Sequence, residues 1–153
     1  MMDEKEFRAA LQAEYFHLQQ VIREFGGRSL TIKSWSVTFC MAALVGAFTA
    51  HTSIAFLVSA LGAFVFWFIE GQWKTFQYAY YARNGEIERY FRGEKELTCA
   101  FQVSTSWTKR WKSYGLRGLA SALAVPHVGM PHIIFCVLGL ALYALSLVGV
   151  VNV

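Results

Sequence analysis

Hydrophobic and polar positions divide the chain into four blocks. Charged residues are confined to positions 1–33 and 70–117, whereas positions 34–69 and 118–153 contain none. Each charge-free block has 36 residues. Because a membrane-spanning helix needs about 20 mostly apolar residues, each block can hold one or two spans. The pattern predicts an all-α integral membrane protein.

The first charged block predicts an amphipathic helix. Apolar residues recur at spacings of three, four or seven over residues 3–25, and Gly26-Gly27 is expected to end the helix. Such a helix either packs on its own protein or serves in oligomerisation or at the membrane surface. Acids and bases balance over residues 1–33. Because surface-binding helices carry an excess of Lys and Arg, this balance favours packing on its own protein.

The first charge-free block predicts a hairpin of two membrane spans. Its one polar run, His51-Thr52-Ser53, divides it into spans at about 34–50 and 54–69. At 16 or 17 residues and about 1.5 Å each, both lie near the short limit for a core of about 30 Å, so we expect flanking residues to extend both helices.

Each predicted span carries a stripe of small residues at a spacing of four. Small residues let helix backbones approach closely in a membrane. The stripes can pack on each other within one chain, or they can mediate self-association between copies. They consist of Ala42, Gly46 and Ala50 in the first span and of Ala55, Ser59 and Ala63 in the second.

An aromatic stripe continues beyond the second span, so we expect its helix to leave the bilayer and run to about Arg92. Asn84-Gly85 is a candidate kink or earlier stop. Glu70 stands at the exit point. Facing solvent, Glu70 is only a helix end; in a symmetric assembly it would join a ring of carboxylates at a pore mouth. The juxtamembrane motif along this helix comprises Trp73, Phe76, Tyr80, Arg83, Glu86 and Glu88.

The rest of the second charged block changes character twice. Residues 97–106 alternate between apolar and polar, which predicts a short strand. Cations then mix with large aromatic residues: Trp107, Lys109, Arg110, Trp111, Lys112 and Arg117. The position of this stretch before a membrane segment favours contact with anionic lipid over binding of single-stranded nucleic acid. A cytosolic protein partner is a further candidate for the whole 70–117 segment.

Prolines divide the second charge-free block. Residues 118–131 are expected to form an interfacial segment that ends at Pro126 and Pro131, because they are too few to cross the bilayer. Residues 132–151 form an apolar run long enough for a third span. With a hairpin and one further span, all fourteen Lys and Arg lie on one side of the membrane. The positive-inside bias therefore predicts a cytoplasmic N-terminus and an external C-terminus.

The sequence offers little catalytic chemistry. It has no phosphate-binding glycine loop and no Cys-x-x-Cys pair, and its only Asp is Asp3, which argues against a Ser/His/Asp triad. Neither a cofactor nor a metal is expected, since His127 and His132 have no carboxylate near them in sequence. The three cysteines are widely spaced, and two fall in apolar blocks, which favours buried thiols. The absence of Asp, Glu, Lys and Arg within the spans argues against a self-contained transporter.

The architecture resembles that of a known class of bacterial membrane proteins. An N-terminal helix, a tight two-span hairpin and an aromatic helix are similar to SLATT-type effectors of bacterial conflict and antiphage systems. The similarity covers residues 3 to about 92 and includes Trp73-Lys74-x-Phe76-Gln77-x-x-Tyr80-Tyr81-x-Arg83-x-x-Glu86-Ile87-Glu88. This chain adds the 97–117 segment and a third span.

The resemblance implies an oligomeric protein of the bacterial inner membrane that permeabilises or depolarises the membrane when a cytosolic partner triggers it. The leading hypothesis is therefore a non-enzymatic, self-associating membrane effector, with the 70–117 segment as its cytoplasmic contact surface. The alternative is a structural or anchoring subunit that recruits a cytosolic protein and leaves the membrane intact.

Overall fold

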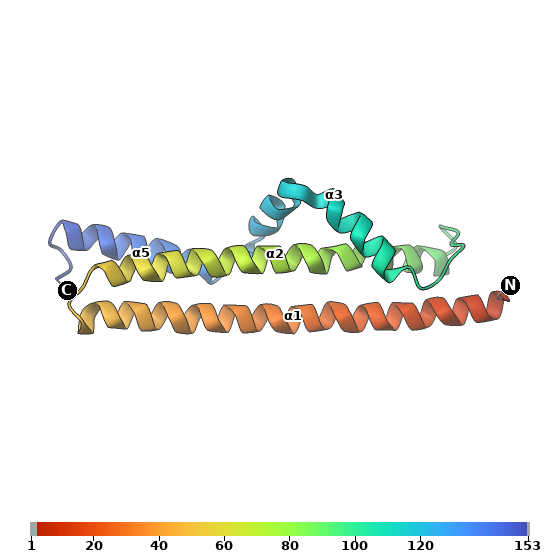
Figure 1. The fold of residues 1–153 in the computed structure, drawn as a ribbon, viewed down its shortest axis with the longest axis horizontal. Coiled ribbons are helices and arrows are strands. Elements are labelled where there is room, and N and C mark those ends of the chain that lie inside the picture. The colour runs from red at the N-terminus through yellow and green to blue at the C-terminus, as the bar shows by residue number, and fades with distance from the viewer. Residues whose placement is uncertain (1–2, 153) are drawn as a thin grey trace.

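The computed structural model describes residues 3–152, and across them it is all-helical. Two long antiparallel helices lie side by side, a third apolar helix packs along one half of the pair, and a bent helix arches over the other half (Figure 1). The helices are α1 (Glu4–Thr49), α2 (Ile54–Phe91), α3 (Val103–Leu123), α4 (Pro126–Gly129) and α5 (His132–Leu147).

Helix α1 is longer than the sequence predicts. A capping box starts it: Glu6 N–H donates to the Asp3 carboxylate at 2.6 Å, and Asp3 N–H donates to Glu6 at 3.1 Å. The helix then continues through Gly26-Gly27, so the stop predicted there is wrong. An internal glycine costs only about 1 kcal/mol relative to alanine. The face of α1 that is buried against α2 continues on both sides of the two glycines, at Ile22 and Ser29, and this packing stabilises the unbroken helix.

Helix α2 agrees with the prediction of a helix that runs to about Arg92. It passes through Asn84-Gly85 without a stop and is capped at its C-terminus by Arg92. The N-terminal part of α1 packs on it through Leu11 and Leu18, which touch Ile87 in a buried cluster. The N-terminal helix therefore packs on its own chain.

No strand forms anywhere in residues 3–152, so the strand predicted over 97–106 is wrong. Residues 92–102 are turn and irregular chain, and α3 begins at Val103. Leu97, Ala100 and Val103 pack against the Leu11–Ile87 cluster at a spacing of three instead of alternating between two faces. A lone strand without a neighbour is marginal, and no other segment here offers one.

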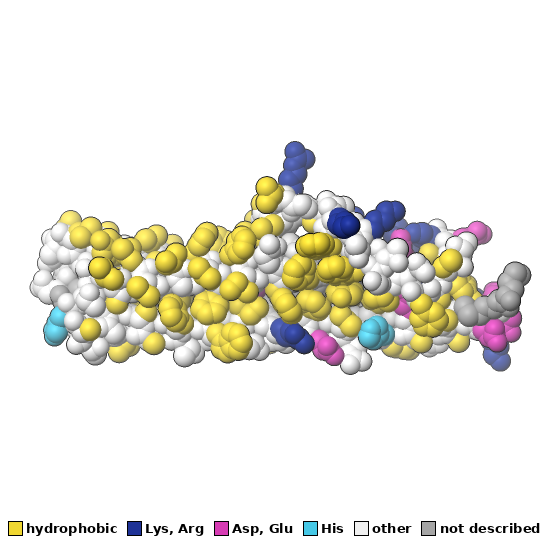
Figure 2. Space-filling view, in the orientation of Figure 1, with side chains coloured by type: hydrophobic (Ala, Val, Ile, Leu, Met, Phe, Trp, Pro, Cys, Tyr) yellow, Lys and Arg dark blue, Asp and Glu magenta, His cyan; other side chains and the backbone are white. Residues whose placement is uncertain are grey.

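The half of the molecule around α5 presents an apolar surface. In Figure 2 the coloured side chains of this half are almost all hydrophobic, whereas Lys, Arg, Asp and Glu gather over the other half. Helices α1 and α2 each contain a segment long and apolar enough to cross a membrane, while α5, with 16 residues, is shorter. Large apolar side chains exposed here include Trp35, Phe39, Phe48, Leu61, Phe64 and Val137.

Helix α3 bends at Gly115, whose backbone (φ 51°, ψ −155°) is not helical. A positive φ of this kind is easy for glycine and strained for other residues. The bend separates a basic and aromatic limb before Gly115 from an apolar limb that ends at Leu123. The predicted interfacial segment 118–131 thus consists of that apolar limb, a short connection and α4.

Candidate functional site

Glu70 is the centre of a buried polar cluster that joins α1, α2 and α5. Its side chain has no solvent exposure. Oε1 accepts hydrogen bonds from Ser29 Oγ and Lys33 Nζ, each at 2.6 Å, and Oε2 lies 2.9 Å from His132 Nε2. The exposed helix end that the sequence offers as one alternative is wrong, because Glu70 is buried and α2 continues past it. The ring of carboxylates between copies stays a prediction, and within one chain the carboxylate already has three partners.

The same cluster holds the segment that leads into α5. With His132 Nε2 donating to Glu70, Nδ1 accepts from Ser36 Oγ at 2.8 Å. Lys33 Nζ also donates to the backbone oxygens of His127 at 2.6 Å and Met130 at 2.9 Å. Helix α5 therefore starts at a fixed level relative to α1 and α2.

Ser36, His132 and Glu70 form a hydroxyl–imidazole–carboxylate chain that the sequence reasoning missed. The acid of this chain is a Glu rather than an Asp, and the three residues are 34 to 96 positions apart in the sequence. All three side chains are fully buried, so no substrate reaches the serine. The arrangement suits positioning of α5 rather than nucleophilic catalysis. Among residues 3–152 no group of three or more His, Cys, Asp or Glu is arranged to hold a metal.

The cluster lies where the charge-free half of the hairpin meets the charged half. Lys33 is the last charge before the first apolar block, and Glu70 is the first charge after it. Farther into the charged half, Lys74 is nearly buried and donates to Gln77 Oε1 at 2.8 Å. Burial lowers the pKa of the Lys74 ammonium by more than the nearby Glu70 carboxylate raises it.

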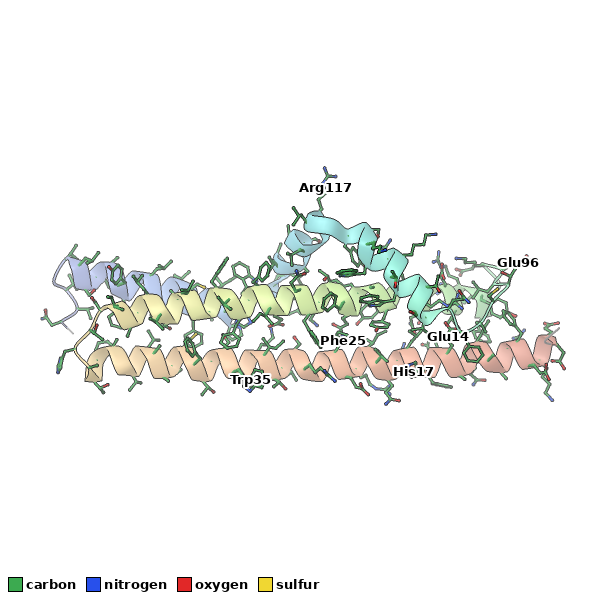
Figure 3. The ribbon with its side chains drawn as sticks, viewed as in Figure 1. Glu14, His17, Phe25, Trp35, Glu96 and Arg117 are labelled. Carbon is green, nitrogen blue, oxygen red and sulfur yellow. The ribbon has the colours of Figure 1, made fainter. Side chains whose placement is uncertain are left out.

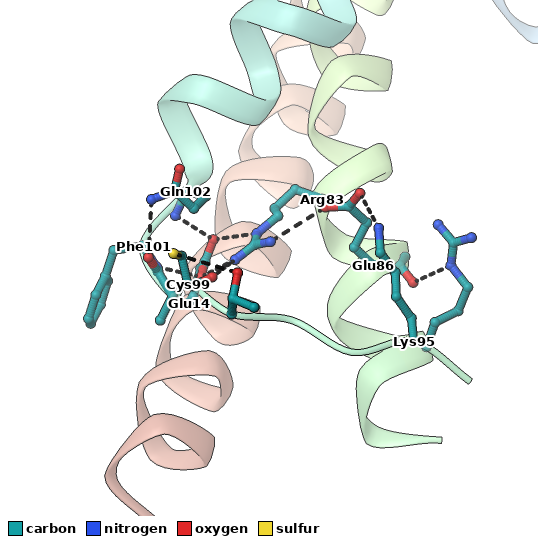
Figure 4. A network of polar contacts seen from close by, with 11 residues as sticks. Glu14, Arg83, Glu86, Lys95, Cys99, Phe101 and Gln102 are labelled. Atoms are coloured by element: carbon teal, nitrogen blue, oxygen red, sulfur yellow. Dashed lines mark hydrogen bonds and ion pairs between the residues drawn. The ribbon is translucent and has the colours of Figure 1, made fainter. Parts of the chain in front are cut away.

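A second buried network lies in the charged half, farther from the apolar half than the Glu70 cluster (Figure 4). Arg83 donates from Nε to Glu14 Oε1 at 2.8 Å and from Nη2 to Glu14 Oε2 at 3.0 Å. The same carboxylate accepts the backbone N–H groups of Phe101 at 2.8 Å and Gln102 at 3.2 Å. Each carboxylate oxygen of Glu14 on α1 thus accepts one hydrogen bond from Arg83 on α2 and one from the backbone that leads into α3.

Glu86 extends this network towards the loop. Its carboxylate accepts from Lys95 Nζ at 2.7 Å and from Arg83 Nη1 at 3.4 Å. Burial alone would raise the pKa of Glu86, but Lys95 and Arg83 together hold it below its usual value. The last acid of the juxtamembrane motif, Glu88, accepts from Tyr15 and Asn84.

The sequence predicts that the aromatic residues of α3 contact lipid headgroups. In the structure these residues pack largely on α2. Trp107 donates from Nε1 to the Phe76 backbone oxygen at 3.1 Å and stacks on Trp111, with ring centres 5.5 Å apart. Both indoles also contact the Phe76 ring, and Trp107 contacts Tyr80. The juxtamembrane aromatics are therefore the platform on which α3 packs.

The cations of α3 remain outside this aromatic contact. Lys109, Arg110, Lys112 and Arg117 are all exposed. Arg117 points away from the rest of the molecule near the apex of the arch (Figure 3). The cations of the predicted lipid or partner contact are therefore accessible. Its two tryptophans pack against α2, and only part of Trp111 is exposed.

The two stripes of small residues do not face each other. On α2, Ser59 and Ala63 are buried and Ala55 is half-buried, and Ser59 Oγ donates to the Cys40 backbone oxygen at 3.2 Å. On α1, Ala42 and Ala50 are exposed, and a side chain placed at Gly46 would meet nothing within 4 Å. Helix α1 packs on α2 through Cys40, Leu44 and Ala47 instead.

Comparison of the chain with known protein families, curated proteins and solved structures finds no match. The SLATT-type resemblance therefore depends on architecture and on the juxtamembrane residues.

Proposed function

We propose that this protein is a non-enzymatic, self-associating, multi-pass protein of the bacterial inner membrane whose short spans perturb the bilayer. The observation that carries the proposal is the common level at which three apolar helices begin. Lys33 on α1, Glu70 on α2 and His132 at the start of α5 meet in one cluster. Each apolar segment therefore extends from the same plane.

Helices α1 and α2 are long enough to cross a bilayer, but the charge-free part of each of the three helices is shorter than the hydrocarbon core. Helix α5 has 16 residues, or about 24 Å at 1.5 Å per residue, against a hydrocarbon core of about 30 Å. The apolar parts of α1 and α2, at 34–50 and 54–69, are of similar length. Spans shorter than the core thin the bilayer or oligomerise. The cluster prevents an individual helix from sliding or tilting to relieve the mismatch.

The uncovered stripe on α1 supports self-association. Ala42, Gly46 and Ala50 face away from α2, and α5 packs on α2 rather than over them. Small residues on a lipid-facing surface allow a second copy to approach closely. A cytoplasmic signal has a direct route to this surface, because α1 runs without a break from the charged half into the apolar half.

The mismatch can be tested by dye release from vesicles of graded thickness. We would reconstitute the protein into phosphatidylcholine vesicles with short, medium or long monounsaturated chains. Leakage is expected to increase with chain length, since the mismatch grows. Absence of leakage at every thickness would overturn the proposal. Protection of expressing cells against phage would separately test the role in antiphage defence that the resemblance implies.

A matched pair of variants tests self-association. Gly46→Ile adds bulk to the uncovered stripe, whereas Val45→Ile adds one methylene to the neighbouring lipid-facing position. We expect Gly46→Ile to lower both the mass of the purified particle in detergent and the leakage, and Val45→Ile to change neither. If Gly46→Ile leaves the mass unchanged, the stripe is not the contact between copies.

The anchoring subunit remains a second candidate, favoured by the enclosure of Glu70. Its carboxylate is taken up by Ser29, Lys33 and His132 and is not free to line a pore mouth. Such a subunit would recruit a cytosolic protein through the 70–117 segment. It would be silent in every vesicle and would leave the membrane potential of expressing cells unchanged, whereas the effector would depolarise them.

A further inference from the structure

A polar cleft lies between α2, the loop over 96–102 and the first limb of α3. Its volume is about 750 Å³. It is separate from the Glu70 cluster and lies on the face of α3 that its tryptophans leave free. Gln102, Thr105, Ser106, Lys109 and Ser113 line it at spacings of three and four, which places them along one side of the helix.

Cations reach this cleft from two helices. Arg89 of α2 and Lys109 and Arg110 of α3 line it, and none of these three forms an ion pair with a carboxylate within residues 3–152. Arg110 also stacks over Tyr114 at 5.2 Å, which restrains its guanidinium. The cleft therefore holds three positive charges without a fixed counterion.

The acidic groups of the cleft do not cancel these charges. Glu86 forms ion pairs with Lys95 and Arg83, and Arg83 also forms an ion pair with Glu14 (Figure 4). Glu96 is the remaining lining acid and lies exposed on the loop. Counting Arg83, Arg89, Lys109 and Arg110 against Glu86 and Glu96, the lining has a net charge of +2.

Hydroxyl groups complete the lining. Thr105 and Ser106 stand one helical turn before Lys109 and Arg110, on the same stretch of α3. Guanidinium, ammonium and hydroxyl donors arranged around one space match an anion with several acceptor oxygens, and phosphate is the common biological group of that kind. A single carboxylate would leave most of these donors without a partner.

We propose that this cleft binds a phosphate-bearing anion through Arg89, Lys109 and Arg110, assisted by the hydroxyls of Thr105 and Ser106. Either a soluble phosphorylated compound or the headgroup of an anionic phospholipid can supply that chemistry. The proposal does not depend on bilayer perturbation, because binding is measured without leakage.

The test is calorimetric titration of the purified full chain in neutral detergent. The probes are inorganic pyrophosphate for a soluble source and short-chain phosphatidylglycerol for a lipid source, with short-chain phosphatidylcholine as the zwitterionic control. The test variant is Lys109→Gln with Arg110→Gln. The matched control is Lys112→Gln with Arg117→Gln, which removes the same charge from the same helix outside the cleft.

We expect the test variant to bind the preferred probe about tenfold more weakly or worse, and the control to keep its affinity within about twofold. Loss confined to pyrophosphate identifies a soluble ligand, and loss confined to phosphatidylglycerol identifies a lipid. Equal loss in both variants would mean general surface attraction and would overturn the proposal, as would no binding of either probe. Arg89→Gln, on another helix, repeats the test if the double variant loses helicity.

Discussion

The two halves of the α1–α2 pair are held together by different chemistry. In the charged half, polar side chains meet across the helices: Arg83 with Glu14, Gln19 with Asn84, and Gln77 with the Ile22 backbone oxygen. In the apolar half the contact consists of Cys40, Leu44, Ala47, Phe56 and Ala63. The polar contacts between α1 and α2 in that half are the reciprocal hydrogen bonds of Cys40 and Ser59, between side chains and backbone oxygens.

This difference follows from the surroundings proposed for each half. In water, apolar burial drives helix association without direction, and paired polar groups fix which residues face each other. Lipid offers no such drive, so close contact between small residues takes its place. The Glu70 cluster lies at the junction and belongs to both halves. It sets the register of the charged half and the starting level of the apolar one.

The largest effect is expected from Glu70→Ala. This change removes the carboxylate partner of His132, which is fully buried, and leaves Lys33 with only the backbone oxygens of His127 and Met130. Breaking a buried ion pair in this way costs about 3–5 kcal/mol. Denaturant titration in mild detergent measures the loss. Helix α5 should also loosen from α2, so Cys136, whose thiol donates to the Ala60 oxygen, should react faster with a small thiol reagent.

Glu24→Ala is the control for the Glu70 variant, because Glu24 is exposed on α1. An exposed change of this kind stays within about 0.5 kcal/mol. If both variants unfold alike, or if Cys136 is no more reactive after Glu70→Ala, the cluster does not hold the two halves in register.

Arg83→Met should have the next largest effect, about 3 kcal/mol. The buried Glu14 carboxylate loses its cation, but the N–H groups of Phe101 and Gln102 still donate to it. The loss in free energy of unfolding therefore falls at the low end of the range for breaking a buried ion pair. Thermal unfolding in detergent gives the change in stability, and protease cleavage in the 92–102 loop reports whether α3 detaches. Arg89→Met, exposed on the same helix, should leave both measurements near those of the parent protein. Equal cleavage in both variants would contradict this role of Arg83.

The sequence predicts the features that depend on local periodicity. The spacing of Leu11, Leu18 and Ile22 identifies the face of α1 that packs on α2, and the aromatic stripe beyond Ile69 predicts that α2 continues to about Arg92. The first charge-free block locates both helices that are long and apolar enough to cross a membrane, whereas α5 in the second block is shorter. These signals repeat within a few turns of helix and need no knowledge of distant partners.

The features that the sequence does not predict depend on residues far apart in the chain. Ser36 and His132 meet only because α5 folds back along α2. Helix α1 continues past Gly26-Gly27 because of its packing on α2, which local propensity does not contain. Trp107 and Trp111 likewise pack on Phe76, a residue of another helix more than 30 positions away in the chain.

Gly139→Leu tests the apolar half by itself. A Cβ at Gly139 would lie 2.7 Å from the Phe56 backbone oxygen and 3.0 Å from Ala60, so α5 packs on α2 too closely for a larger side chain. We expect a loss of about 1–3 kcal/mol from overpacking, measured by denaturant titration in detergent. Ala141→Leu, at an exposed position of α5, is the control. A Gly139 variant as stable as this control would contradict close packing as the basis of the apolar half.

The smallest effect is expected for the change in stability with pH that Glu86 causes in the charged half. The pKa of Glu86 is lower in the folded protein than its usual value of about 4.3, so its ion pairs stabilise the fold above that pH and are lost as the pH falls through the folded value. Because the side chains of Glu86 and Lys95 are 29% and 38% exposed, the contribution is below about 1 kcal/mol. Denaturant titrations of the parent protein and Glu86→Gln should differ at neutral pH and converge in acid, and a gap that persists in acid would show that the variant acts through packing rather than charge.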